Sequence, residues 1–327
     1  MKLRILSGED VRRALPMRQA IEALKDAFAQ LSAGRADAPL RTALDVARHN
    51  GVTLFMPGYL ADDDQMAIKI VSVFNNNPVH GLPLIHALIV VVDATTGAPA
   101  AVMDGTYLTA LRTGAASGAA TDLLARPDAS VAAIFGAGAQ ARTQLEAVCA
   151  VRPIEEALVY DIAPEQAEVY AAEMSERLSL PVRAVGMPSE AASWADVICT
   201  ATTSSSPVFD DADVQLGAHI NGVGAYTPQM QEIPAETVLR AKVVIDHHEA
   251  SLAEAGDLLI PLERGLMTEA HIYAELGEIA AGHKPGRETE EEITFFKSVG
   301  VAVQDVAAAS AALSAAQSQG LGTEISL

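Results

Sequence analysis

The stretch that most constrains the fold of this chain is VAAIFGAGAQA, residues 131–141, in which an apolar run leads into closely spaced glycines. The spacing is G-x-G-x-x-A, and Leu145, Val148 and Cys149 continue at helical spacing. A strand, a tight turn and a helix in this order are typical of the first βα unit of a dinucleotide-binding domain. A tight connection that binds no ligand has the same pattern, so the stretch alone leaves both interpretations open.

The small residues of this stretch have separate physical tasks. Gly136 permits the tight turn, and Gly138 removes a Cβ so that a pyrophosphate can approach the backbone. Ala141 lets the helix pack closely on the strand. The helix N-terminus adds unpaired N–H groups and the positive end of the helix dipole, so the sequence predicts phosphate binding here.

An acidic residue at the end of the next strand favours the dinucleotide interpretation. Asp161 follows Gly136 by about 25 residues, close to the spacing at which a carboxylate binds the adenosine ribose hydroxyls. A carboxylate there repels a 2′-phosphate, so we expect NAD(H) rather than NADP(H). The alternative is an ordinary acid at a strand end.

Residues 131 to about 290 alternate apolar strands with helical patterns. This alternation predicts a doubly wound α/β domain, with a parallel sheet covered on both faces. The expected strands are VAAIF, ALVYD, VRAV, DVICTAT, HINGVGA and KVVIDH. Ligands of such sheets bind beyond the carboxyl ends of the strands, where Thr202 and Gly222 to Ala225 follow two of them.

The flanking sequence has a different texture. Residues 42–102 contain β-rich segments joined by turn signals, which predict a mostly antiparallel sheet, and residues 106–125 predict a tightly packed Ala-rich helix. The tail, residues 291–320, is a second Ala-rich stretch, predicted helical, that can return to the first domain. We expect a substrate domain of residues 1–125 plus 295–327, and a nucleotide-binding domain of residues 126–294.

Charge and composition exclude several classes of function. A net charge of −20 and a pI near 4.7 repel nucleic acid and anionic membranes. No apolar run is long enough for a membrane span, and the N-terminus becomes charged too early for a signal peptide, so we expect a cytoplasmic protein. Cys149 and Cys199 lack the spacing of a zinc or redox site and are expected to be reduced thiols; we predict no metal.

Three cations in the first domain are candidates for substrate binding: Arg41, Lys69 and Arg112. Lys69 and Arg112 lie in apolar segments, where a charged group is rarely buried without a partner. A substrate carboxylate is one such partner, and arginine offers it a bidentate fork. Each of the three has the alternative of a solvated surface position, and this alternative is strongest for Arg41.

Several motifs together closely resemble the ornithine cyclodeaminase/mu-crystallin family. They are MAIKIVSVFNNNPVHGLP, DATTGAPAAVMDGTYLTALRTGAASGAATDLLA, GAGAQA and ITFFKSVGVAVQD, and the resemblance covers nearly the whole chain. It implies a Rossmann domain inserted into a discontinuous α+β substrate and dimerisation domain. It also implies a homodimer.

The resemblance implies a role for individual residues. Lys69 and Arg112 would be catalytic, and Arg41, Lys69, Arg112 and Val299 would bind substrate. The residues implied or predicted to bind the dinucleotide are Thr113, Gly136, Gly138, Ala139, Gln140, Asp161, Thr202, Gly222, Val223, Gly224, Ala225 and Ser298.

One departure from the family pattern bears on the reaction. Cyclodeaminases have an acid/base Asp just after the fifth strand, whereas this chain has Tyr226 in GAYTP. A phenol is a poor replacement for a carboxylate base near neutral pH. The resemblance therefore implies the reductive branch, in which NADH reduces a 2-imino acid to the L-amino acid.

In that reaction Arg112 and Arg41 would hold the carboxylate, and Lys69 would stabilise or protonate the imine nitrogen. Because three cations can bind more than one carboxylate, the substrate can be a dicarboxylate such as iminosuccinate, with His86 as a further contact. The other candidate substrates are a cyclic ketimine and a pyruvate-derived imine. The alternatives are an ornithine cyclodeaminase, which forms L-proline and ammonia, and a nucleotide- or hormone-binding protein without turnover.

Overall fold

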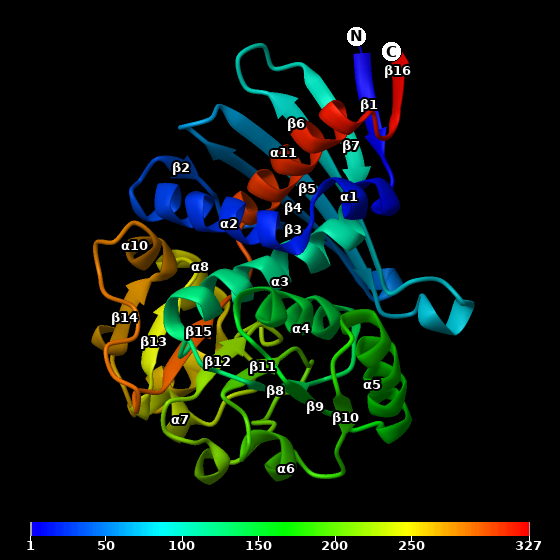
Figure 1. Ribbon diagram of the computed structural model, residues 1–327. Coiled ribbons are helices and arrows are strands. Elements are labelled where there is room, and N and C mark those ends of the chain that lie inside the picture. The colour runs from blue at the N-terminus through cyan, green and yellow to red at the C-terminus, as the bar shows by residue number, and fades with distance from the viewer. Residues whose placement is uncertain (1, 327) are drawn as a thin grey trace. The chain divides into compact units, whose positions relative to one another are not determined.

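The computed structural model describes residues 2–326. The chain divides into two compact units (Figure 1). Unit 1 comprises Met1–Arg112 and Val301–Leu327, and unit 2 comprises Thr113–Gly300. The discontinuous unit and the inserted unit follow the predicted architecture. The predicted limits at 125/126 and 294/295 differ from these divisions, and the predicted ranges remain a prediction.

Unit 1 is built on an eight-stranded mixed sheet. The N- and C-terminal strands β1 and β16 pair antiparallel at its edge (Figure 1), β1 pairs parallel with β7, and the remaining pairs are antiparallel. In sheet order the strands are β16 (Thr323–Ser326), β1 (Lys2–Leu6), β7 (Pro99–Asp104), β6 (Ile85–Asp93), β5 (Gln65–Phe74), β4 (Gly51–Leu60) and β2 (Ala36–Asp37), with β3 (Thr42–Val46) on β4.

Helices cover one face of this sheet. α11 packs against β4, β5 and β6, and α2 packs on α11 and β4. Gly58 allows the close approach, because a Cβ there would lie 2.9 Å from the Cγ2 of Val306. The helical segments of this unit are α1 (Gly8–Ala14), α2 (Met17–Ser32), α11 (Ala302–Gln319) and the 3-10 turns η1 (Ala47–His49) and η2 (Pro78–His80); α3 (Gly105–Leu124) begins in this unit and ends in unit 2.

Unit 2 contains an eight-stranded sheet whose pairs are all parallel. Its order is β10 (Val182–Ala184), β9 (Glu156–Tyr160), β8 (Val131–Phe135), β11 (Val197–Thr200), β12 (His219–Gly222), β15 (Thr294–Lys297), β13 (Lys242–Ile245) and β14 (Ile272–Glu275). β11, β12 and β15 are buried along their whole length, as expected for strands covered on both faces. The predicted doubly wound sheet is confirmed.

Short helices join these strands. Most follow the βα pattern, in which a helix returns the chain to the start of the next parallel strand. They are α4 (Ala139–Val151), α5 (Pro164–Leu178), α6 (Pro188–Ala192), α7 (Ala235–Arg240), α8 (His248–Glu254), α9 (Gly256–Glu263) and α10 (Leu276–Ala280), with 3-10 turns η3 (Asp211–Asp213) and η4 (Glu269–His271).

The start of the tail differs from the prediction. Residues 294–297 form β15 in the interior of the parallel sheet, between β12 and β13, and the helix α11 begins only at Ala302. The prediction of helix was wrong because a short apolar run fits a buried strand as well as a buried helix. The placement of β15 in unit 2 follows from pairing with strands about 50 to 75 residues earlier in the sequence, which local patterns do not reveal.

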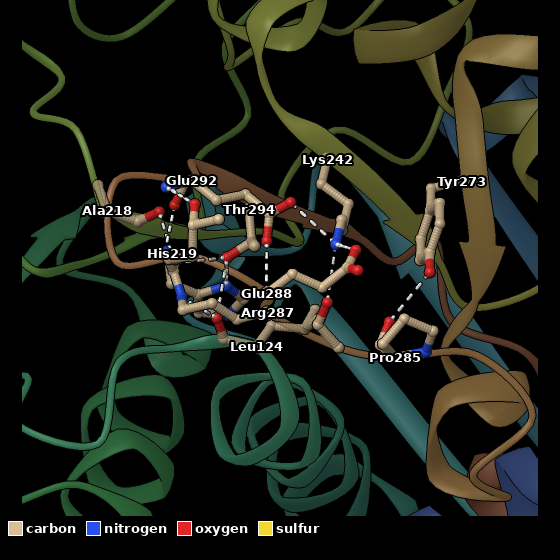
Figure 2. Close-up of polar contacts among 12 residues, drawn as sticks. Leu124, Ala218, His219, Lys242, Tyr273, Pro285, Arg287, Glu288, Glu292 and Thr294 are labelled. Atoms are coloured by element: carbon tan, nitrogen blue, oxygen red, sulfur yellow. Dashed lines mark hydrogen bonds and ion pairs between the residues drawn. The ribbon is translucent and has the colours of Figure 1, made fainter.

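A polar cluster fixes the amino end of β15 (Figure 2). Arg287 donates to the carbonyl oxygen of Leu124 at 2.7 Å, to that of Ala218 at 3.2 Å and to the hydroxyl of Thr294 at 3.1 Å. Lys242 forms ion pairs with Glu288 at 2.7 Å and with Glu292 at 2.8 Å. These contacts tie the segment before β15 to the starts of its neighbours and leave the carboxyl ends of the strands for function.

Candidate functional site

The glycine turn between β8 and α4 has the geometry that its spacing predicts. Gly136 has φ +93°, a conformation that L side chains rarely adopt. A Cβ at Gly136 would also lie 2.8 Å from the carbonyl oxygen of Ala201. This glycine is therefore required by the backbone turn and by the neighbouring strand end.

Gly138 serves no such packing purpose. A Cβ at this position would meet no atom of the chain within 4 Å. Gly138 is the N-cap of α4, and no side chain caps the helix there, so the first N–H groups of Ala139 and Gln140 face this open side. Missing bulk beside an uncapped helix N-terminus fits the approach of a phosphate.

A cavity of about 540 Å³ opens at this turn. It is lined by the glycine turn, by the end of β9 and by the loop after β11. Its lining includes Gly136, Gly138, Asp161, Ile162, Thr202 and Thr203. Ile162 is 91% exposed on this wall, where an apolar side chain offers a surface for a flat ring.

Asp161 connects the two sides of this cavity. Its Oδ2 accepts from the N–H of Ala137 at 2.8 Å, and its Oδ1 accepts from the N–H of Ala163 at 2.9 Å. The backbone thus orients the carboxylate beside the glycine turn, while each oxygen keeps a second lone pair for a hydroxyl donor. The structure places Asp161 together with Gly136 and Gly138, as the sequence predicted.

A buried carboxylate that the sequence prediction missed holds the loops after β11 and β12. Glu232 is fully buried and accepts from the N–H and hydroxyl of Thr202 at 2.6 and 2.8 Å. It also accepts from the N–H groups of Gly224 and Ala225 at 2.7 and 3.0 Å. Burial, and then the nearby Asp257, raise the pKa of Glu232. Thr202 and the 222–225 segment are therefore brought together by one side chain.

Asp257 continues this network toward β15. Its Oδ1 accepts from the N–H of Glu232 at 2.6 Å, and its Oδ2 pairs with the ammonium of Lys297 at 2.7 Å. Asp257 and Lys297 are both fully buried. The pair fixes the carboxyl end of β15, just before Ser298 and Val299.

Asp246 shapes the segment that contains Ser298 and Val299. Its Oδ2 accepts from the hydroxyl of Ser298 at 2.7 Å and from the N–H groups of Val299 and Gly300 at 2.9 Å each. Asp246 directly follows β13, as Asp161 directly follows β9, so the sequence contained a signal for it. Ser298 and Val299 are buried, at 2% and 7% exposure.

In unit 1 a second buried polar cluster surrounds Lys69. Its ammonium lies 2.8 Å from Oδ2 of Asp305, and Nε of Arg112 lies 3.1 Å from Oδ1 of the same carboxylate. Arg112 also donates to Oε1 of Gln304 at 2.6 Å. The predicted pair Lys69 and Arg112 is thus brought together by Asp305 of α11, which the sequence prediction missed.

The charge state of Lys69 is adjusted by this environment. Burial above all, followed by the positive charge of Arg112, lowers the pKa of Lys69 to about 7. Asp305 acts in the opposite direction, and half-buried Arg41 adds to the lowering. An ammonium of this kind exchanges its proton near neutral pH.

Other predicted residues have different positions. His86 pairs with Ser72 on β5, so strand alternation places it on the opposite face of the sheet from Lys69, and it does not join this cluster. Thr113 directly follows Arg112 in α3, and its carbonyl oxygen accepts from Gln144 of α4 at 3.2 Å. Tyr226, after Ala225, is 41% exposed.

No group of three or more His, Cys, Asp or Glu side chains within residues 2–326 is placed to hold a metal ion. No helix in the described range combines the length and apolar character needed to cross a membrane.

Known proteins are similar to this chain over nearly its whole length. Residues 1–320 match the ornithine cyclodeaminase/mu-crystallin family. A Delta(1)-pyrroline-2-carboxylate reductase of Bacillus cereus is 40% identical over 322 residues, which cover 98% of this chain and 99% of the relative.

Two solved structures have the same fold. Thermococcus litoralis Delta(1)-pyrroline-2-carboxylate reductase in complex with NADH and L-proline has a TM-score of 0.94 and 46% identity, over 98% of this chain and 100% of that chain. An archaeal alanine dehydrogenase dimer with bound NAD has a TM-score of 0.93 and 36% identity, with 100% of both chains covered. This chain belongs to the ornithine cyclodeaminase/mu-crystallin family.

Proposed function

We propose that this chain is an NADH-dependent oxidoreductase that reduces a 2-imino acid to the L-amino acid. The observation that carries the proposal is the buried cluster of Lys69 and Arg112 around one carboxylate. An ammonium with a pKa of about 7 can donate a proton near neutral pH, and a guanidinium fork binds a carboxylate. A 2-imino acid has a basic nitrogen and a carboxylate on adjacent carbons, so it matches both groups.

The glycine turn supports NAD(H) as the cofactor. The open side of Gly138 and the uncapped start of α4 fit a pyrophosphate, and Asp161 is oriented to accept from ribose hydroxyls. The other residues proposed to hold the dinucleotide are Thr113, Gly136, Ala139, Gln140, Thr202, Gly222, Val223, Gly224, Ala225 and Ser298. When bound, the dinucleotide supplies the hydride.

The residues of the chain supply orientation and a proton. Arg112 and Arg41 hold the substrate carboxylate. Nζ of Lys69 would give its proton to the imine nitrogen, and the bound dinucleotide would supply the hydride, with its electron pair, for the imine carbon. The C=N double bond thereby becomes CH–NH, and Lys69 regains its proton from solvent.

This chain has Tyr226 at the position where cyclodeaminases have an acid/base Asp. The difference supports imine reduction over cyclisation of ornithine. A cyclodeaminase requires a base at the substrate amines, and a phenol serves this role poorly near neutral pH. The relatives that reduce pyrroline-2-carboxylate make a cyclic ketimine the first substrate to test.

The test is NADH oxidation by the purified full chain with a panel of imines. The panel contains pyrroline- and piperideine-2-carboxylate, and pyruvate, glyoxylate and oxaloacetate each with ammonia. We expect NADH oxidation with at least one imine and formation of the matching L-amino acid. If no imine is reduced while ornithine gives proline and ammonia, the proposal is wrong and the cyclodeaminase alternative holds. NADH binding without any turnover would instead support the binding-protein alternative.

We further propose that the chain is a homodimer in the cytoplasm. The homodimer is supported by the face of the unit 1 sheet opposite α11, where apolar residues lie side by side on neighbouring strands. Two such rows are Phe55, Ile70 and Leu88, and Pro57, Ile68 and Val90. Leu88 is 42% exposed, and Leu44 on β3 is 58% exposed. A sheet with apolar side chains on both faces gains stability when a second copy covers the outer face.

A further inference from the structure

Asp305 is a buried carboxylate shared by two cations from different elements. It lies in the first turn of α11 and is 1% exposed. Lys69 reaches its Oδ2 from β5 at 2.8 Å, and Arg112 reaches its Oδ1 from α3 at 3.1 Å. The helix dipole favours a negative charge at this end of α11.

The charges around Lys69 are unbalanced. The charged groups that act on it are Arg112 from α3, Arg41 from the segment before β3, and Asp305 from α11. Its cross-strand neighbours, Met56 on β4 and Ile89 on β6, have no charge. Asp305 is thus the single anion among these groups, set against three cations when Lys69 is protonated.

We propose that Asp305 is a positioning residue of the imine reduction, which orients Lys69 and Arg112 and sets the pH range in which Lys69 keeps its proton. The inference rests on the proposed function. A carboxylate 2.8 Å from an ammonium favours the charged form, while burial and two neighbouring cations oppose it. If the carboxylate is removed, only burial and the two arginines act on Lys69, and both lower its pKa.

The sign of the effect on activity follows directly. Lys69 donates a proton only in its charged form, so kcat/KM for the imine falls as pH rises through about 7. In Asp305→Asn we expect the falling limb of the profile of kcat/KM against pH to move to lower pH, by about one to two pH units. The asparagine keeps the shape of the side chain, so the change isolates the charge.

Two further variants separate charge from structure. Asp305→Glu retains the anion and is expected to keep the position of the falling limb, with a lower kcat because the longer side chain misplaces Lys69. Gln304→Leu removes a neutral partner of Arg112 and is expected to raise KM without moving the limb. NADH binding, followed by its fluorescence, reports whether each variant is folded.

The pKa of Lys69 can also be read without turnover. The chain contains six lysines, so the Cε resonance of Lys69 in protein with ¹³C-labelled lysine is assignable by comparison with Lys69→Met. We expect Asp305→Asn to lower this pKa and Arg112→Leu to raise it. If Asp305→Asn does not fold, Asp305→Glu keeps the test available, because it retains the anion and should leave this pKa unchanged while kcat falls.

The outcomes are distinct. In one outcome, Asp305→Asn leaves both the falling limb of the pH profile and the pKa of Lys69 unchanged and reduces kcat equally at all pH values. This outcome would show that Asp305 has a structural role only. If the unmodified protein reduces no imine, the proposed function fails, and the NMR titration still decides whether Asp305 controls the charge of Lys69.

Discussion

At the residue scale, Lys69 is the side chain on which the proposed chemistry depends. A fully buried ammonium with a pKa of about 7 is costly for folding, because burial disfavours its charged form. Such groups are concentrated at functional sites, where a proton must be exchanged near neutral pH. The neighbouring Arg112 and Asp305 have no comparable role as proton donors.

We expect Lys69→Met to lower kcat for the imine by about 10²- to 10⁴-fold, the range over which a positioned general acid contributes. Methionine keeps the length and volume of the side chain, so the unit 1 core should be preserved. Steady-state kinetics and NADH titration measure the two effects, and NADH affinity should stay within about twofold. An unchanged kcat would remove Lys69 from the mechanism.

Asp161 governs the choice between the two dinucleotides. In Asp161→Ala, loss of a charge-assisted hydrogen bond to ribose should raise the Kd for NADH by about tenfold or more. The repulsion of a 2′-phosphate is lost as well, so the preference for NADH over NADPH should narrow. Parallel titrations with both cofactors check this, and a preserved preference ratio would contradict the ribose assignment.

Prediction from sequence reached only some of these residues. Lys69 and Arg112 stand out because they are charged residues within apolar segments. Asp305 follows Arg112 by 193 positions, and its role arises from tertiary contact that local spacing does not encode. Glu232 was missed for the same reason, since its partner Thr202 is 30 positions away.

At the element scale, the turn between β8 and α4 contains one glycine that packing requires, Gly136, and one that cofactor binding is proposed to require, Gly138. Gly138→Val should leave the thermal midpoint of unfolding nearly unchanged, because the new side chain meets open space. It should raise the Kd for NADH by about tenfold or more, because the new side chain fills the space needed by the pyrophosphate. Calorimetry and NADH titration measure the two quantities.

The matched control is Gly136→Val in the same turn. It forces a β-branched residue to φ +93° and a Cβ to 2.8 Å from the Ala201 carbonyl oxygen, so it should lower the midpoint of unfolding. If Gly138→Val lost stability instead of cofactor affinity, the phosphate role of this turn would be incorrect.

The elements themselves were predictable to different degrees. Strands β8 to β13 were found from their apolar runs, and α3 from its Ala-rich pattern. β15 was not, because its short apolar run also fits a buried helix and because it joins the sheet out of sequence order. β14 was not, because it is an edge strand with only one buried residue, Ala274. The polar cluster around Arg287 that fixes β15 in Figure 2 also depends on contacts distant in sequence.

At the scale of the whole molecule, the outer face of the unit 1 sheet predicts self-association. Ile68→Asp places a charge within the apolar register of Pro57 and Val90, so it should convert a dimer to a monomer. Light scattering coupled to size-exclusion chromatography measures the mass. Val169→Asp, at a residue 63% exposed on α5, is the matched control and should leave the mass unchanged. A monomeric unmodified protein would contradict the proposal.

The proposed reaction transfers a hydride to the imine carbon, and transfer of an isotope label from NADH to the product detects this step. NADH labelled with deuterium at C4 is incubated with the full chain and pyrroline-2-carboxylate or another imine that is reduced, and the amino acid is examined by mass spectrometry. We expect one deuterium at C2 of the L-amino acid from one of the two C4-labelled stereoisomers, with equal consumption of NADH. An unlabelled amino acid from both stereoisomers, or L-proline formed from ornithine with no net change in NADH, would contradict it.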